Sequence, residues 1–189
     1  MAAVVTMVHD LAAYERAAQM CHLTGTQLEA ALFGPAPALF GHVVVDEAEE
    51  AEPLGFALWF LNFSSWRGRH GVYLEDLYVR PEARGTGAGH ALLAELAGTC
   101  VERGYPRLEW SVLDWNTPAQ DFYRRAGAVA MADWTVWRLA GDALSGDALP
   151  GAALPGAADR RPAAAGTLEP PNEASRTRAA DDDGGAGSG

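Results

Sequence analysis

The feature that most constrains this chain is a glycine-rich turn between an expected strand and an expected helix. Residues 73–89 read YLEDLYVRPEARGTGAG and include Gly85, Gly87 and Gly89. Glycine has no Cβ, so the chain can turn tightly, and the N–H groups that open the following helix can face an anion. The helix dipole adds favourable potential for negative charge there. The turn therefore predicts either a site for a phosphate-bearing ligand or a purely structural strand-to-helix connection.

Two common nucleotide-binding loops do not fit this turn. The sequence lacks the G-K-[ST] that ends a nucleoside-triphosphate P-loop, and its glycine spacing differs from the G-x-G-x-x-G of dinucleotide folds. The glycine loop alone leaves the choice between ligand site and structural turn open.

Hydrophobic spacing and turn residues predict a mixed α+β chain with no internal repeat. The order is two helices, three strands, a helix, a strand, a helix and a last strand. The helices are expected near residues 11–18, 24–33, 90–103 and 117–126, and the strands at 39–45, 54–62, 71–79, 108–113 and 135–139. An acidic segment at residues 46–53 is expected to be an exposed connection between the first two strands.

Composition separates a folded part from a tail. From residue 141 the sequence is a mixture of Ala, Gly, Pro and Asp without Phe, Trp, Tyr, Ile or Val. Such a segment cannot bury enough apolar surface to offset the entropy of ordering it. We therefore expect one folded domain over residues 1–140 and a disordered tail over residues 141–189.

Charge and cysteine content restrict which ligands and partners this chain is expected to bind. Asp and Glu outnumber Arg by 25 to 14, giving a net charge of −11 that disfavours nucleic acid and anionic membranes and favours cations. The two cysteines lie far apart and belong to no Cys/His cluster, so no metal site is expected. Neither a signal peptide nor a membrane span is predicted, and a cytoplasmic location is expected.

The sequence resembles the GCN5-related N-acetyltransferase superfamily. Its signature, R/Q-x-x-G-x-G/A after a strand, is met by Arg84, Gly87 and Gly89. Further segments resemble the spermidine/spermine branch of that superfamily: residues 11–15 (LAAYE), 55–57, 73–76 (YLED), 115–128 (WNTPAQDFYRRAGA), 137–139 and the turn with Trp66 and Gly68. The resemblance implies a central, mostly antiparallel sheet flanked by helices, with the first strand of the family missing before residue 11.

The resemblance also implies acetyl-coenzyme A (acetyl-CoA) as co-substrate and assigns residues to it. The main chain of Leu77, Tyr78 and Val79 would bind the pantetheine arm at a splayed strand. The pyrophosphate would lie on the glycine loop, and two residues further along would also touch the coenzyme. The complete predicted set is Leu77, Tyr78, Val79, Arg84, Gly85, Thr86, Gly87, Ala88, Gly89, His90, Asn116 and Tyr123.

Acetyl transfer to an amine needs a base and an acid. An alkyl ammonium, with a pKa of about 10, must lose a proton before it can attack, and the departing thiolate benefits from gaining one. By resemblance Glu75 is the base, directly or through water, and Tyr123 is the acid. The competing interpretations are a solvent-facing Glu75 and a Tyr123 that belongs to the core.

The acceptor site is expected to be acidic and aromatic, because ammonium groups gain from both. By resemblance the amine channel consists of Tyr14, Glu15, Trp66, Glu75 and Asp76, although Tyr14 alone would also suit ordinary helix packing. A polyamine or diamine acceptor is expected. The alternatives are an amino acid such as a lysine analogue, an aminoglycoside, a protein N-terminus, or a module that binds acetyl-CoA without turnover. Resemblance also implies a homodimer.

Overall fold

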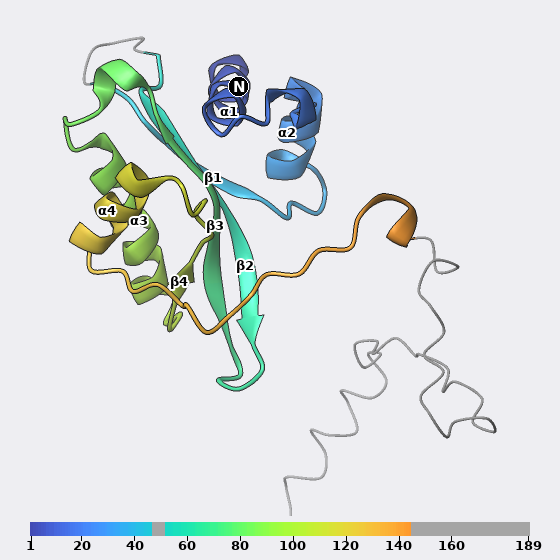
Figure 1. Cartoon of the computed structure of the whole chain (residues 1–189), viewed down its shortest axis with the longest axis vertical. Coiled ribbons are helices and arrows are strands. Elements are labelled where there is room, and N and C mark those ends of the chain that lie inside the picture. Colours follow the sequence, from blue (N-terminus) through green and yellow to red (C-terminus); the bar gives the residue numbers. More distant parts are fainter. Residues whose placement is uncertain (47–51, 145–189) are drawn as a thin grey trace, which may run out of the picture. The chain divides into compact units, whose positions relative to one another are not determined.

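The computed structural model describes residues 1–46 and 52–144, which fall into two units, residues 1–131 and residues 132–144. The first unit is built on a sheet of four strands in the order β1-β2-β3-β4 (Figure 1). They are β1 (Phe40–Val44), β2 (Gly55–Ser64), β3 (Arg69–Val79) and β4 (Leu108–Glu109). The first three pair antiparallel and β4 runs parallel to β3, so the predicted mixed sheet is confirmed.

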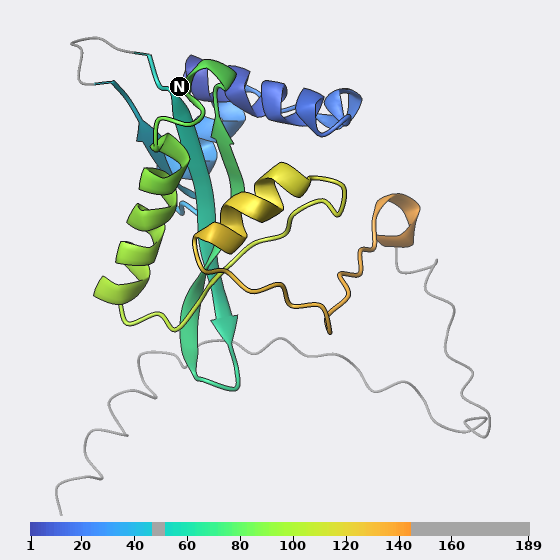
Figure 2. The same cartoon turned by 60° about the vertical axis from the view of Figure 1, so that its left-hand side comes forward.

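Helices cover both faces of this sheet. They are α1 (Ala2–Tyr14), α2 (Gly25–Phe33), α3 (Ala88–Glu102) and α4 (Thr117–Arg125). Figures 1 and 2 show α1 and α2 on one side of the sheet and α3 and α4 on the other. Since α1 already begins at Ala2, the residues before Leu11 lengthen the first helix. None of the helices in the described part of the chain is long and apolar enough to cross a membrane.

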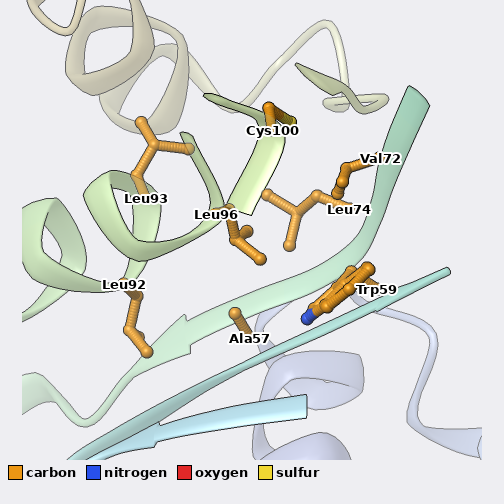
Figure 3. Packing of buried hydrophobic residues seen from close by; sticks show 8 residues of the cluster. All are labelled: Ala57, Trp59, Val72, Leu74, Leu92, Leu93, Leu96 and Cys100. Carbon is orange, nitrogen blue, oxygen red and sulfur yellow. The ribbon is translucent and has the colours of Figure 1, made fainter. Parts of the chain in front are cut away.

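The core between the sheet and α3 is formed by apolar side chains at helical spacing. Leu92, Leu93, Leu96 and Cys100 of α3 pack against Ala57 and Trp59 of β2 and Val72 and Leu74 of β3 (Figure 3). Phe122 and Tyr123 of α4 lie against the edge of this cluster. The helix that follows the glycine loop is therefore anchored on the sheet by its own apolar face.

A second core lies on the other face of the sheet. Met7 of α1 and Leu28 of α2 are buried against Phe56, Leu58 and Tyr78. The start of α2 is fixed locally by a capping box, in which Thr24 and Gln27 satisfy each other's backbone N–H groups. This packing holds α1 against the sheet, with its C-terminal end near the end of β3.

Two predicted strands are corrected by the structure. Residues 135–139 form no strand, and β4 ends at Glu109 rather than at residue 113. Apolar alternation suggests a strand, but a strand also needs a hydrogen-bonded neighbour. Val136 and Trp137 are 80% and 91% exposed, so the residues that suggested this strand are not buried as its pattern required.

The predicted tail and acidic connection are described only in part. Residues 141–144, assigned by sequence to a disordered tail, form a short 3₁₀ helix, Gly141–Leu144. The rest of that tail, residues 145–189, and residues 47–51 of the acidic connection lie outside the described residues.

Candidate active site

A cleft with a volume of about 540 Å³ lies at the open edge of β3. Its walls come from the C-terminal half of β3, the end of α1, the glycine loop with the start of α3, the segment after β4, and α4. Every site residue predicted from the sequence lines this cleft except Thr86, Ala88 and Trp66. Segments separated by about a hundred residues therefore meet where the sequence analysis expected one site.

The cleft exists because β3 and β4 diverge. They pair only at Val72 with Leu108 and at Tyr73 with Glu109, whereas β3 continues to Val79. Trp110 and Ser111 leave the sheet and form the opposite wall. The outer edge of β3 beyond Tyr73 thus has no strand partner in the described part of the chain, which leaves main-chain groups free to bind an extended ligand.

An irregularity in β3 decides which side chains enter the cleft. Leu58 of β2 is opposite Asp76 and Trp59 is opposite Leu74, so Glu75 is one extra residue in β3, a β-bulge. The alternation of faces reverses there. Leu74 before the bulge and Leu77 after it both pack towards α3. As a result Glu75 and Asp76 both line the cleft.

The glycine loop has the geometry of an anion site. Gly85 and Gly87 have φ of 81° and 97°, a region that only glycine enters freely. Gly87 is the N-cap of α3, and no side chain caps that helix, so the N–H groups of its first turn keep no side-chain partner. A Cβ at either glycine would meet no atom within 4 Å. This open, positively polarised turn fits the pyrophosphate of a coenzyme.

Arg84 connects the loop to two aromatic rings. Its Nε donates a hydrogen bond of 3.1 Å to the carbonyl oxygen of Val79. Its guanidinium lies 5.6 Å from the ring centre of Tyr14 and 5.8 Å from that of Tyr78. Thr86, in contrast, donates to the carbonyl of Ala83 at 2.8 Å and contributes to the shape of the loop rather than to the cleft surface.

Three carboxylates line the cleft near enough for the charges of two of them to act on the third: Glu15, Glu75 and Asp76. Burial, followed by the negative charges of Glu75 and Glu15, raises the pKa of Asp76 to about 6. Burial also raises the pKa of Glu15. A cluster of this kind attracts cations and can accept a proton near neutral pH.

Tyr123 lines the cleft. It projects from α4 and packs against Trp110, with 4.7 Å between ring centres, and against Phe122, with 5.1 Å. Burial raises the pKa of its phenol to about 12, with a smaller contribution from Glu15. The hydroxyl therefore keeps its proton at neutral pH and can donate it.

Asn116 joins two walls of the cleft. It is the N-cap of α4, and its Oδ1 accepts from the backbone N–H of Ala119 at 3.3 Å. The same oxygen accepts from the hydroxyl of Tyr14 at 3.1 Å. The ring of Tyr14 lies 5.8 Å from that of Trp115, and the guanidinium of Arg16 lies 4.9 Å from the centre of the Trp115 ring.

The structure also separates one predicted residue from the site and adds others. Trp66 lies in the turn between β2 and β3, is 90% exposed and does not line the cleft. Trp110, Ser111 and Phe122 line the cleft but were not among the predicted residues. The aromatic Trp110, inside the strand expected at residues 108–113 and directly after the observed β4, is the signal that could have revealed this wall.

Comparisons with known proteins agree with this geometry. Residues 8–128, well over half of the chain, match the Acetyltransferase (GNAT) family. Thialysine N-epsilon-acetyltransferase of Bos taurus is 34% identical over 151 residues, which cover 75% of this chain and 87% of that protein. L-ornithine N5-acetyltransferase of Arabidopsis thaliana is 39% identical over 99 residues, covering 52% of this chain and 43% of that protein.

A solved structure shows the same fold. An integron cassette protein from the mobile metagenome of V. cholerae matches with a TM-score of 0.63 and 24% identity, covering 78% of this chain and 90% of its own. At 24% identity this similarity supports a shared fold only. Enzymes of the matched family use acetyl-CoA as co-substrate. With the family matched over the residues that build the cleft, this chain is an N-acetyltransferase and belongs to the acetyltransferase (GNAT) family.

Proposed function

We propose that this enzyme acetylates a primary amine of a small molecule that carries at least two amino groups, with acetyl-CoA as donor. Diamines, polyamines and diamino acids all belong to this class. The observation that carries the proposal is the gathering of Glu15, Glu75 and Asp76 in the cleft that also holds the phenol of Tyr123. One ammonium of the acceptor would stay charged and bind the carboxylates, while the other loses its proton and reacts.

Within this class, two kinds of acceptor have support. The three carboxylates of the cleft suit a diamine or polyamine, because such an acceptor has only positive charges. The relatives named for thialysine and L-ornithine favour a diamino acid instead. Its carboxylate would need a cation, and Arg84 and Arg125 both line the cleft.

The proton of the reacting amine would leave towards the two adjacent carboxylates of β3. Glu75 stands on the bulge at the cleft and is the proposed base, acting directly or through water. Asp76 lies next to it, and its raised pKa allows it to hold a proton near neutral pH. The pair would therefore bind the ammonium and receive its proton.

Tyr123 is the proposed acid. When the carbon–sulfur bond of the thioester breaks, its bonding electron pair goes to sulfur, and the phenol can supply a proton to the resulting thiolate. The hydroxyl remains protonated across the working pH range because its pKa is about 12.

Coenzyme binding is proposed for the glycine loop and the open strand edge. Arg84, Gly85, Gly87, Gly89 and His90 would hold the pyrophosphate, with Thr86 and Ala88 as the intervening residues of the loop. The main chain of Leu77, Tyr78 and Val79 would face the pantetheine arm, and Asn116 would contact it from the other wall.

A thiol-release assay with acetyl-CoA tests this proposal. The panel contains diamines, polyamines, ornithine, thialysine, an aminoglycoside, a peptide with a free N-terminus, and monoamines of matching length. We expect higher kcat/KM for compounds with two or more amino groups than for the matched monoamines. Equal rates for monoamines, or turnover restricted to peptides, would contradict the proposed acceptor class.

The proton-donor role is tested by Tyr123→Phe. This change removes only the hydroxyl, so we expect kcat to fall about 100-fold or more with little change in the Kd of acetyl-CoA. Tyr105→Phe removes a hydroxyl that lies outside the cleft and should leave kcat near the unmodified value. An unchanged kcat in Tyr123→Phe would remove this residue from the chemistry.

Assembly and location complete the proposal. A homodimer is proposed from the family resemblance, and light scattering after gel filtration would show it as twice the 20.0 kDa chain mass. A cytoplasmic location is proposed as well. Both cysteines, Cys21 and Cys100, are free thiols, which suits a reducing compartment.

A further inference from the structure

Tyr14 contacts two residues that are proposed to hold the coenzyme, Asn116 and Arg84. The resemblance places it in the amine channel, yet its hydroxyl donates to Asn116 Oδ1 at 3.1 Å. Its ring lies 5.6 Å from the guanidinium carbon of Arg84. Arg84 precedes α3 and Asn116 caps α4, so one residue at the end of α1 connects the N-terminal ends of both helices.

Two donors, the backbone N–H of Ala119 and the hydroxyl of Tyr14, hold the same oxygen of the Asn116 amide. The backbone N–H of Ala119 can only donate, so the amide atom that faces it at 3.3 Å must be the oxygen. The Tyr14 hydroxyl donates to that same oxygen, so both of its acceptor positions are used. The NH₂ group is then held on the other side of the amide, in a residue that is only 7% exposed and lines the cleft.

These same contacts engage both the hydroxyl proton and a ring face of Tyr14. Its hydroxyl proton is already donated to Asn116. A ring face that could receive a cation is near the guanidinium of Arg84 instead. Both groups of the side chain are therefore engaged by residues proposed to hold the coenzyme.

We propose that Tyr14 is a positioning residue for the coenzyme: it orients the Asn116 amide so that its NH₂ donates to an oxygen of the pantetheine arm. The inference rests on the proposed use of acetyl-CoA by this cleft. Acceptor binding is then left to Glu15, Glu75 and Asp76, while α1 contributes to both substrate sites through adjacent residues, Tyr14 and Glu15.

Isothermal titration of the full chain with acetyl-CoA, without any amine, tests the inference. Tyr14→Phe keeps the ring and removes the hydroxyl, and we expect Kd to rise roughly 3- to 10-fold, the effect of one hydrogen bond. Asn116→Asp keeps an acceptor for the Ala119 N–H, so α4 remains capped, but removes the NH₂ donor. We expect Asn116→Asp to weaken binding at least as much, and Tyr105→Phe, outside the cleft, to leave Kd unchanged.

The double variant separates a positioning role from an independent contact. If Tyr14 acts through the amide, adding Tyr14→Phe to Asn116→Asp should produce no further loss of affinity. Thermal unfolding of each variant is measured alongside, and Asn116→Ser, which also retains a capping oxygen, takes the place of Asn116→Asp should that protein not fold.

Three results would overturn the inference. An unchanged Kd for Tyr14→Phe would do so, as would additive losses in the double variant or a wild-type protein that does not bind acetyl-CoA. A higher KM for the amine with an unchanged coenzyme Kd would return Tyr14 to the amine channel. Failure of the proposed acceptor class looks different, because it would abolish turnover of diamines and leave these coenzyme affinities as expected.

Discussion

At the scale of single residues, Asp76 shows how the site conflicts with the stability of the fold. The bulge places this carboxyl in a buried position near two other acidic groups, Glu75 and Glu15. Its pKa is therefore raised from 3.8 to about 6. In this interval the folded protein holds a proton that the unfolded chain releases, so stability falls as pH rises through it. The charged form that is proposed to bind the acceptor ammonium is thus the form that the fold tolerates least.

We therefore expect Asp76→Asn to stabilise the protein at neutral pH while reducing its activity. A pKa raised from 3.8 to about 6 corresponds to roughly 3 kcal/mol, so the free energy of unfolding in urea should rise by about 2–3 kcal/mol at pH 7. Below about pH 3 the carboxyl is protonated in both states and the gain should disappear. A full gain that persisted at about pH 3, or none at pH 7, would contradict this account of Asp76.

Local motifs predicted most site residues, and long-range contacts explain what was missed. The segments around Glu75, the glycine loop and Tyr123 carry their own spacing, and the structure gathers them on one cleft. The capping role of Asn116 could have been read from its place before Thr117 and Pro118. Its bond to Tyr14 could not, because 102 positions separate the two residues and no local pattern records such a contact.

At the scale of elements, α3 presents two glycines in very different settings. Gly87 is its uncapped N-terminal residue with φ of 97°, whereas Gly98 lies inside the helix and an added Cβ there meets nothing within 4 Å. The first position needs glycine for its backbone angle. The second has glycine where alanine would fit.

Alanine at these two positions should have opposite effects. Gly87→Ala forces a left-handed conformation on a residue with a Cβ, so we expect a loss of about 1–2 kcal/mol and weaker acetyl-CoA binding. Gly98→Ala should add roughly 0.5–1 kcal/mol and leave binding unchanged. Urea unfolding and titration calorimetry measure both. Equal effects at the two sites would mean that the loop geometry does not govern coenzyme binding.

Elements with strong local sequence signals were predicted, whereas the limits of elements that depend on neighbouring strands were not. The predicted helix at residues 117–126 corresponds to α4, since Thr117 and Pro118 set its start. The extent of β4 depends on where β3 diverges from it, and the predicted strand at 135–139 lacks burial of Val136 and Trp137. The bulge at Glu75 is seen only in the register with β2.

At the scale of the whole molecule, charge should influence acceptor binding. The chain carries a net charge of −11 and its cleft is lined by the three carboxylates of Glu15, Glu75 and Asp76. We expect the KM of a diamine to rise several-fold between about 0.05 M and 0.5 M salt, because salt screens the attraction. The matched monoamine should respond less. A diamine KM that stays constant across this range would argue against electrostatic capture.

The domain boundary predicted near residue 140 also leads to an experiment. The family match ends at residue 128, and the composition changes at residue 141. A chain shortened after Ala140 should therefore keep its unfolding midpoint and its affinity for acetyl-CoA. Thermal unfolding and calorimetry measure these two quantities. A large drop in either would show that the segment after Ala140 contributes to the folded, coenzyme-binding enzyme.

The single extra residue in β3 has a consequence for how acceptor preference can be compared between related enzymes. The extra residue Glu75 reverses the alternation of side chains between the two faces of β3. In a related enzyme without this bulge, every later side chain of the strand would point to the opposite face, even if the motif had the same residues. Percentage identity does not register such an inversion. Counting residues between the hairpin and the glycine loop would therefore be a better guide to shared substrates than scoring matches along them.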